Sequence, residues 1–389
     1  MKYNFDELTD RSGTNSLKWD VSDNELPMWV ADMDFKTAPQ ITEALEKRAR
    51  HGIFGYSVIP PEWYGAYIGW WKRRYGFEIK REWLIFSTGV IPVISSVVRK
   101  LTTPAENVVV FTPVYNIFFN SIVNNGRNVL ECPLKYDGDE YFIDFDDLER
   151  KLKNPQTTML IFCNPHNPVG KIWDRETIKK VGSLCKKHGV IAVSDEIHCD
   201  LTAFGKSYTP FASVSDECAQ NCIMCVAPTK TFNIAGLQTA AAVVPNEFLR
   251  NKVNRALNTD EVAEPNCFAT AAAIAAYDGG GQWLDELRQY LDENREIVHT
   301  ALKSIKAVKS DATYLMWLDC SEICENSREL ARFIRRETGL YLSDGAQYGT
   351  GGEKFLRLNI ACPKERLADG IKRLETGTER YKNAVTQKA

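Results

Sequence analysis

Residues 157–196 read TTMLIFCNPHNPVGKIWDRETIKKVGSLCKKHGVIAVSDE. Two runs of strand length, TTMLIFC and VIAVSDE, are apolar along both faces, as strands buried on both sides of a parallel sheet are. The stretch between them has helical spacing and ends in a basic turn before Gly189, which is a helix stop signal. This segment predicts an α/β domain in which helices lie against a mostly parallel sheet.

The same alternation of apolar runs and helical stretches extends over about residues 80–245. Further strand candidates are NVVVF (107–111), NCIMCVA (221–227) and TAAAVV (239–244). After residue 260 the pattern changes to long helices and two strand candidates, TYLMWLDC (313–320) and KFLRLNIAC (354–362). We therefore expect a large domain over 49–284 and a smaller α+β domain over 285–389, completed by the N-terminal segment 1–48.

The composition is that of an ordinary folded protein. The 389 residues carry 48 Lys and Arg against 51 Asp and Glu, so no broad field attracts nucleic acid or an anionic membrane surface. The first residues show no secretory signal, and no apolar run approaches the ~20 residues of a membrane span. The eleven cysteines are an odd number and lie in apolar stretches, which favours reduced thiols. We expect a cytoplasmic protein that binds neither nucleic acid nor membranes.

Four segments carry side chains suited to chemistry at the ends of the predicted strands. APTKTFNIAGL (227–237) holds Lys230, a candidate nucleophilic amine, although a lone lysine in a polar turn is ordinarily a surface residue. SDEIHCDL (194–201) ends a strand in Asp195 and places His198 three residues later. NPHNPVG (164–170) forces an extended turn that presents Asn164. STGVIP (87–92) turns into a helix whose first N–H groups suit a phosphate.

In their order along the chain, from STGVIP to APTKTFNIAGL, the segments resemble the fold-type-I pyridoxal-phosphate (PLP) enzymes, the aspartate-aminotransferase superfamily. Further motifs extend the resemblance over nearly the whole chain, to the carbon–sulfur lyases of the MalY/PatB type that are similar to cystathionine β-lyases. These motifs are GTNSLKWD (13–20), PMWVADMDF (27–35), GVIPVIS (89–95), TPVY (112–115) and FLRLNIACP (355–363). The resemblance implies a large PLP-binding domain, PLP as cofactor, an amino-acid substrate with a β-sulfur leaving group, and a homodimer.

The resemblance also implies a role for individual residues. Lys230 would be the Schiff-base lysine, Asp195 would bind the pyridinium nitrogen, and Tyr115 would stack on the ring. Asn164 would bond the ring oxygen with His198 nearby, and Arg357 would clamp the substrate carboxylate. The phosphate would be bound by Gly89, Val90, Ile91 and Thr229, and by Tyr56 of the partner subunit. Trp29 and Val30 would line the substrate pocket, with packing in the core as the alternative.

Several alternatives stay open at this stage. An aminotransferase would use the same residues as a β-lyase, and a regulatory role through protein contact is a further alternative. The C-x-x-C of Cys222 and Cys225 has no nearby histidine as a further ligand, so we expect buried thiols and no metal site. His166 is either a turn residue or a substrate contact. The aromatic stretch 63–76 is interpreted as a buried helix or a dimer face.

Overall fold

The computed structural model describes residues 2–387 and contains a seven-stranded sheet at its centre. Its spatial order is β2 (Leu84–Ser87), β10 (Ala240–Val243), β9 (Cys222–Val226), β8 (Ile191–Asp195), β7 (Thr157–Cys163), β3 (Asn107–Val110) and β4 (Asn128–Glu131). Strand β10 is antiparallel to both of its neighbours, and the other pairs are parallel. The predicted α/β class with a mostly parallel sheet is confirmed.

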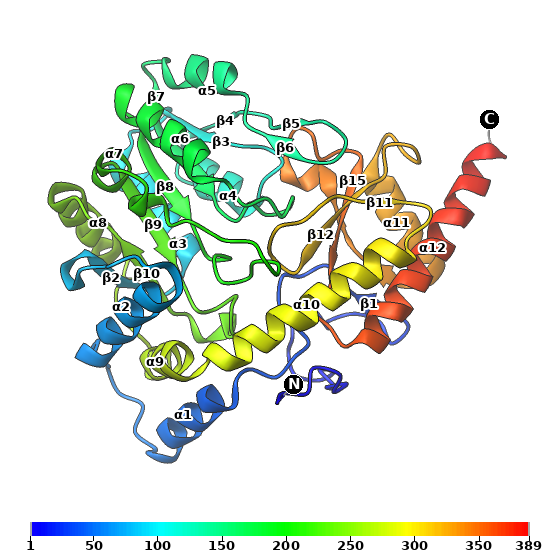
Figure 1. The fold of residues 1–389 in the computed structure, drawn as a ribbon, viewed down its shortest axis with the longest axis horizontal. Coiled ribbons are helices and arrows are strands. Elements are labelled where there is room, and N and C mark those ends of the chain that lie inside the picture. The colour runs from blue at the N-terminus through cyan, green and yellow to red at the C-terminus, as the bar shows by residue number, and fades with distance from the viewer. Residues whose placement is uncertain (1, 388–389) are drawn as a thin grey trace.

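Apolar residues along each central strand alternate between two cores, one on each face of the sheet. In β7, Met159 and Ile161 lie in one core while Leu160 and Phe162 lie in the other. This explains why the run 157–163 is apolar at every position from Met159 to Cys163. Helices cover both faces (Figure 1). They are α2 (Pro61–Tyr75), α3 (Val90–Leu101), α4 (Ile117–Val123), α5 (Phe145–Leu152), α6 (Arg175–Lys187), α7 (Asp216–Gln220), α8 (Glu247–Thr259) and α9 (Ala269–Gly279).

The predicted helix after the NPHNPVG turn is α6, and its boundaries follow from its caps. The carboxylate of Asp174 accepts a hydrogen bond from the Thr177 N–H at 2.7 Å, which satisfies one of the free donors of the first turn. The aromatic stretch forms α2, in which Trp63, Tyr67, Trp70 and Trp71 are buried. This stretch is therefore a buried helix of the monomer.

A second sheet carries the C-terminal part of the chain. Its order is β11 (Lys306–Ala307), β12 (Leu315–Asp319), β15 (Phe355–Asn359) and β14 (Ser343–Asp344). It packs against α11 (Ser327–Thr338), and α11 packs in turn against α12 (Lys364–Thr386). In Figure 1 the long helix α10 (Gly281–Ala301) leads from the part with the large sheet to this part. The N-terminal strand β1 (Leu26–Pro27) pairs in parallel with β13 (Leu340–Tyr341). The helix that follows, α1 (Pro39–Arg50), packs against α9.

The remaining strands, β5 (Lys135–Tyr136) and β6 (Tyr141–Phe142), form a two-stranded ribbon. All eleven cysteines are free thiols, and ten of them are buried. Cys222 and Cys225 lie in β9, and Cys218 lies in α7. Across residues 2–387, no helix combines the length and apolar character needed to cross a bilayer.

Candidate active site

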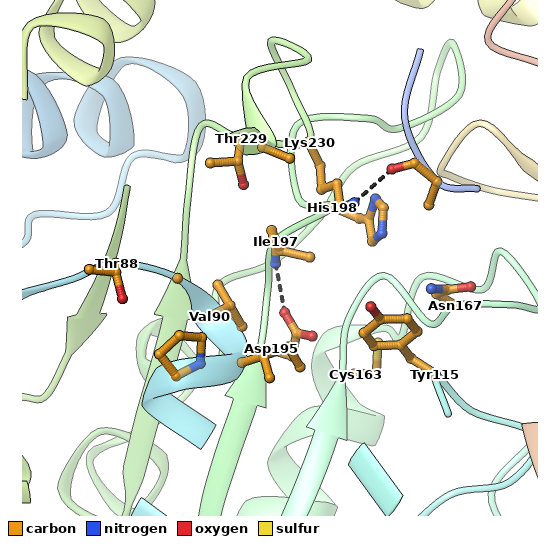
Figure 2. Close-up of a pocket in the computed structure, with 15 residues that line it drawn as sticks. Thr88, Val90, Tyr115, Cys163, Asn167, Asp195, Ile197, His198, Thr229 and Lys230 are labelled. Atoms are coloured by element: carbon orange, nitrogen blue, oxygen red, sulfur yellow. Dashed lines mark hydrogen bonds between the residues drawn. The ribbon is translucent and has the colours of Figure 1, made fainter. Parts of the chain in front are cut away.

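A cavity of about 200 Å³ opens at the carboxyl ends of the central parallel strands. This is the edge at which open α/β sheets bind ligands. Figure 2 shows Tyr115 and Asn167 across the cavity from Thr88 and Val90, with Lys230 and Asp195 between them. The cavity is lined by Ala31, Thr88, Gly89, Val90, Ile91, Pro92, Tyr115, Cys163, Asn167, Asp195, Ile197, His198, Thr229, Lys230 and Ala235.

Lys230 follows β9 and points its amine into this cavity. Its Nζ donates a hydrogen bond to the carbonyl oxygen of Ala31 at 2.6 Å. Burial lowers the pKa of the amine to about 8, because the charged form loses its hydration, and Arg357 acts in the same direction while Asp32 and Asp195 oppose it. The amine is thus available as a nucleophile or base close to neutral pH.

Asp195 is the last residue of β8 and is almost fully buried. Its carboxylate accepts a hydrogen bond from the Ile197 N–H at 3.1 Å. Burial raises the pKa of this carboxyl to about 7, although the Ile197 N–H and Lys230 both act to lower it. The hydrogen bond from Ile197 and the nearby Lys230 offset only part of the cost of burying this charge. The carboxylate therefore favours a cationic partner in the cavity, such as the protonated nitrogen of a pyridine ring.

His198 lies beside these two groups as a neutral ring. Burial lowers its pKa to about 3, with further contributions from Lys230 and Arg357. The ring packs edge-on against Tyr314, with the centroids 5.9 Å apart. Among residues 2–387, nothing pairs with the buried Nδ1 of His198. This nitrogen is free to bond a polar substituent of a bound ring.

The N-terminus of α3 lies at the cavity with its first N–H groups free of partners within the helix. Gly89 caps the helix in an extended conformation, and the N–H groups of Val90 and Ile91 lie in the first turn, where a helix offers them no partner. Thr229 and Thr88 line the cavity beside this turn. N–H groups, hydroxyls and the helix dipole together suit a phosphate.

The structure brings Asn167 to the cavity where we expected Asn164. Both polar atoms of the Asn164 side chain bond the protein backbone: Oδ1 accepts from the Trp173 N–H at 3.2 Å, and Nδ2 donates to the Thr209 oxygen at 3.4 Å. Asn167 lines the cavity, and its Oδ1 accepts a hydrogen bond from Nη1 of Arg357 at 3.1 Å. The turn 164–170 therefore uses its first asparagine for its own fold and presents its second.

Arg357 is buried on β15 beside the cavity. Besides Asn167, it bonds the carbonyl oxygen of Trp29 through Nη2 at 2.8 Å, and its guanidinium lies 5.0 Å from the centroid of the Tyr348 ring. Its buried Nε has no hydrogen-bond partner within the described part of the chain. This guanidinium can receive a carboxylate.

Trp29 and Val30, which we expected at the substrate pocket, contribute their carbonyl oxygens to the surroundings of Arg357 and Asn359. The Trp29 ring stacks on Tyr341 with centroids 4.7 Å apart, and neither side chain lines the cavity. Ala31 is the residue of this segment that does. Carbonyl contacts of this kind leave no signal in residue type, so the sequence could not indicate them.

Two other candidates lie outside the cavity. Tyr56 is fully exposed on the loop between α1 and α2 and makes no contact with the cavity of its own chain. His166 is buried in the turn 164–170, where its Nε2 lies 2.9 Å from the Pro113 oxygen and its ring packs edge-on against Trp173. Burial lowers the pKa of His166 to about 4. Of the two interpretations of His166, the turn residue agrees with this position.

Comparison with known proteins agrees with a PLP-binding site. The chain belongs to the aminotransferase class I and II family, whose profile matches residues 24–374. Cystathionine β-lyase PatB of Bacillus subtilis is 44% identical over 96% of this chain and 99% of its own. The family resemblance drawn from the sequence motifs is therefore confirmed.

Two solved structures carry the cofactor in the same fold. Cystalysin from Treponema denticola, which contains pyridoxal 5'-phosphate, has a TM-score of 0.94 and 31% identity over 98% of this chain and 100% of its own. The PLP-bound C–S lyase of Staphylococcus hominis, in complex with L-cycloserine, has a TM-score of 0.91 and 32% identity over 97% and 98% of the two chains. The expected cofactor is thus PLP, and the residues around the cavity fit it.

Proposed function

We propose that this protein is a PLP-dependent carbon–sulfur β-lyase, which cleaves S-substituted cysteines to pyruvate, ammonia and a thiol. The observation that carries this proposal is the 44% identity to a cystathionine β-lyase across almost the full length of both chains. The cavity adds a buried lysine and a buried carboxylate of the kind that PLP chemistry requires. An enzyme of this class takes a sulfur-containing amino acid as its substrate.

PLP bound in this cavity supplies an electron sink for the charge that develops when the α-proton leaves the substrate. We assign Lys230 to its covalent attachment and Asp195 to its ring nitrogen. The N-terminus of α3 and Thr229 would hold its phosphate, and the ring of Tyr115 would pack on its face. We assign the bond to its ring oxygen to Asn167, with His198 beside it, because the Asn164 amide is already bonded to the backbone.

The chain's own groups then bind the substrate and move its proton. Arg357 would pair with the α-carboxylate through a charged, planar contact, and Asn167 fixes the orientation of its guanidinium. The amine of Lys230 would take the α-proton, and the lowered pKa makes it a base near neutral pH.

The assay that tests the proposal omits any 2-oxo acid. The purified protein loaded with PLP is incubated with L-cystathionine or L-cysteine. Pyruvate, ammonia and the sulfur product are measured, which is a thiol from cystathionine and sulfide from cysteine. We expect equal amounts of the three products, since a thiolate leaving group departs from Cβ without an amino acceptor. The Lys230→Ala variant is the control and should give none. Strict dependence on 2-oxoglutarate with formation of glutamate would assign an aminotransferase instead.

We also infer a homodimer with shared active sites. Tyr56 and its neighbours Ile53, Phe54 and Val58 expose large apolar side chains on one loop. Exposed apolar stretches of this kind mark interaction surfaces, and two-fold dimers are the commonest oligomers. Tyr56 would reach the phosphate bound by the other subunit.

We also propose that the chain divides into two domains. We infer a large domain over about 49–284 and a small one over 285–389, which the N-terminal segment 1–48 joins through the pairing of β1 with β13. Helix α1 within that segment packs against α9 of the large part.

We place the protein in the cytoplasm, which the eleven free thiols favour.

A further inference from the structure

The motifs GTNSLKWD (13–20) and PMWVADMDF (27–35) meet in a buried cluster of ions. Lys18 and Asp34 are each only 1% exposed, and their Nζ and Oδ1 atoms lie 3.1 Å apart. Asp34 also pairs with Arg11 at 2.8 Å and with Arg366 of α12 at 3.1 Å. Asp32 pairs with Arg11 at 2.9 Å and with Lys18 at 3.7 Å. Three cations thus surround two carboxylates on one short segment.

The carboxylate of Asp34 stays ionised in this cluster. Burial by itself would raise its pKa, but Lys18, the Trp19 indole N–H, Arg366 and Arg11 together hold the pKa below its usual value. Its contacts therefore act as ion pairs at neutral pH. The cluster ties the N-terminal segment to α12, at the other end of the chain.

The segment that these ions hold carries carbonyl groups directly into the active site. The Ala31 oxygen accepts from Nζ of Lys230 at 2.6 Å, and the Trp29 oxygen accepts from Nη2 of Arg357 at 2.8 Å. The amide of Asn359, two residues from Arg357, donates to the oxygens of Val30 and Asp32 at 2.6 Å each. The segment thus touches both groups assigned to proton transfer and carboxylate binding.

Regular secondary structure does not fix this segment. Residues 28–38 lie between β1 and α1 and belong to neither a helix nor a strand. Their main-chain anchors include Met28 N–H to the Tyr341 oxygen and Asp34 N–H to the Ala361 oxygen, both at 2.9 Å, and Asn233 bonds the N–H and oxygen of Met33. Hydroxyl groups also hold two of its carbonyl oxygens: Tyr314 donates to Ala31 at 3.0 Å and Ser343 donates to Trp29 at 3.1 Å. The side chains of Asp32 and Asp34 add charged anchors to these neutral contacts.

We propose that Lys18, together with Arg11 and Arg366, is a positioning residue of the active site. By holding Asp32 and Asp34, it sets the carbonyl groups of Trp29 and Ala31 where they orient Arg357 and Lys230. This role rests on the functions proposed above for those two residues. Buried ion pairs contribute little net stability compared with apolar side chains of similar size. A role in orienting the segment 28–34 therefore explains the buried Lys18 better than a contribution to stability does.

The test compares three variants of the PLP-loaded protein. Lys18→Met removes one cation, but Arg11 and Arg366 still balance the two carboxylates, so the fold should survive. Lys18→Arg keeps the charge. Lys36→Met is the matched control, because Lys36 lies in the same N-terminal region but forms an exposed pair with Glu7.

Two readouts separate positioning from general stability. Hydrogen exchange of the amides of residues 28–34 should become at least tenfold faster in Lys18→Met, while the central strands β7 and β8 keep their protection. KM for L-cystathionine should rise about tenfold or more, as expected when a hydrogen bond to a charged group is misplaced, and kcat should change less. Lys18→Arg should keep most of the exchange protection of residues 28–34 and a KM close to that of the unsubstituted protein. Lys36→Met should match the unsubstituted protein in both measurements.

Two results would overturn the proposal: unchanged exchange of residues 28–34 in Lys18→Met, or faster exchange spread evenly over the whole chain. The exchange measurement does not depend on the reaction. If the lyase assignment fails, the pyruvate assay reports it separately.

Discussion

Burial lowers the pKa of the Lys230 amine to about 8, and this shift decides how readily the amine reacts near neutral pH. At pH 7 about a tenth of such amines are neutral, whereas an ordinary lysine with a pKa of about 10.4 is neutral in less than about one molecule in a thousand. Asp32 and Asp195 limit the shift, because both carboxylates favour the charged amine. The cavity thus makes a nucleophile of a residue that is normally charged.

We expect the covalent uptake of PLP by the cofactor-free protein to follow this pKa. The protonated amine cannot attack the aldehyde of the cofactor, so the rate should rise about tenfold per pH unit below pH 8 and level off above it. The measurement is the recovery of visible absorbance after PLP is added at pH values from 6 to 10. Lys230→Ala, which lacks the amine, reports how non-covalent binding alone varies with pH. A rate that climbs steadily to pH 10 would show that the cavity does not lower the pKa.

At the scale of elements, the sequence predicts the strands more completely than the turns that follow them. The runs 157–163 and 190–196 are recognisable because residues 159–163 and 190–193 are all apolar and pack alternately into the cores on the two faces of the sheet. The choice between Asn164 and Asn167 depends on how the turn folds back to place the Trp173 N–H, a tertiary contact that residue type does not reveal. The roles of Trp29 and Ala31 lie in their carbonyl groups, which every residue possesses.

The turn 164–170 also joins the two parts of the molecule through Gly170. Its oxygen accepts from the N–H groups of Asp311 and Ala312 at 2.8 and 3.0 Å. Its φ is +73°, and a Cβ at this position would lie 2.2 Å from Oγ and 2.9 Å from Cβ of Ser310. Gly126 has the same φ of +73°, but a Cβ there would meet nothing within 4 Å. The two glycines share a left-handed backbone conformation, but only Gly170 is packed closely against another segment.

We therefore expect Gly170→Ala to lower the free energy of unfolding more than Gly126→Ala does. Both variants place a Cβ in the left-handed region, at a cost of about 1–2 kcal/mol. Gly170→Ala adds the overlap with Ser310, which costs about 1–3 kcal/mol more. Urea unfolding of the two variants measures the difference directly. Equal losses would mean that residues 310–312 do not pack against this turn in solution.

At the scale of the whole molecule, one active site draws on three distant stretches of the chain. Ala31 comes from the N-terminal segment, Asp195 ends β8 and Lys230 follows β9 of the large sheet, and Arg357, on β15 of the small sheet, lies beside the cavity and bonds Asn167. A cavity assembled in this way is sensitive to how the parts are held together. Tyr56, exposed on its own chain, would add a fourth contribution from the second subunit.

Mixing two variants tests whether Tyr56 acts across the dimer. Tyr56→Ala and Lys230→Ala should each lose activity when alone. In a mixed dimer, the subunit with Tyr56→Ala keeps its own Lys230 and receives an intact Tyr56 from its partner, so one of the two sites is complete. Random re-association makes half of the dimers mixed, so about a quarter of the unsubstituted activity should return. Sedimentation should give twice the 44.1 kDa of one chain. Activity that stays at the average of the two variants, or an active species of 44.1 kDa, would contradict a shared site.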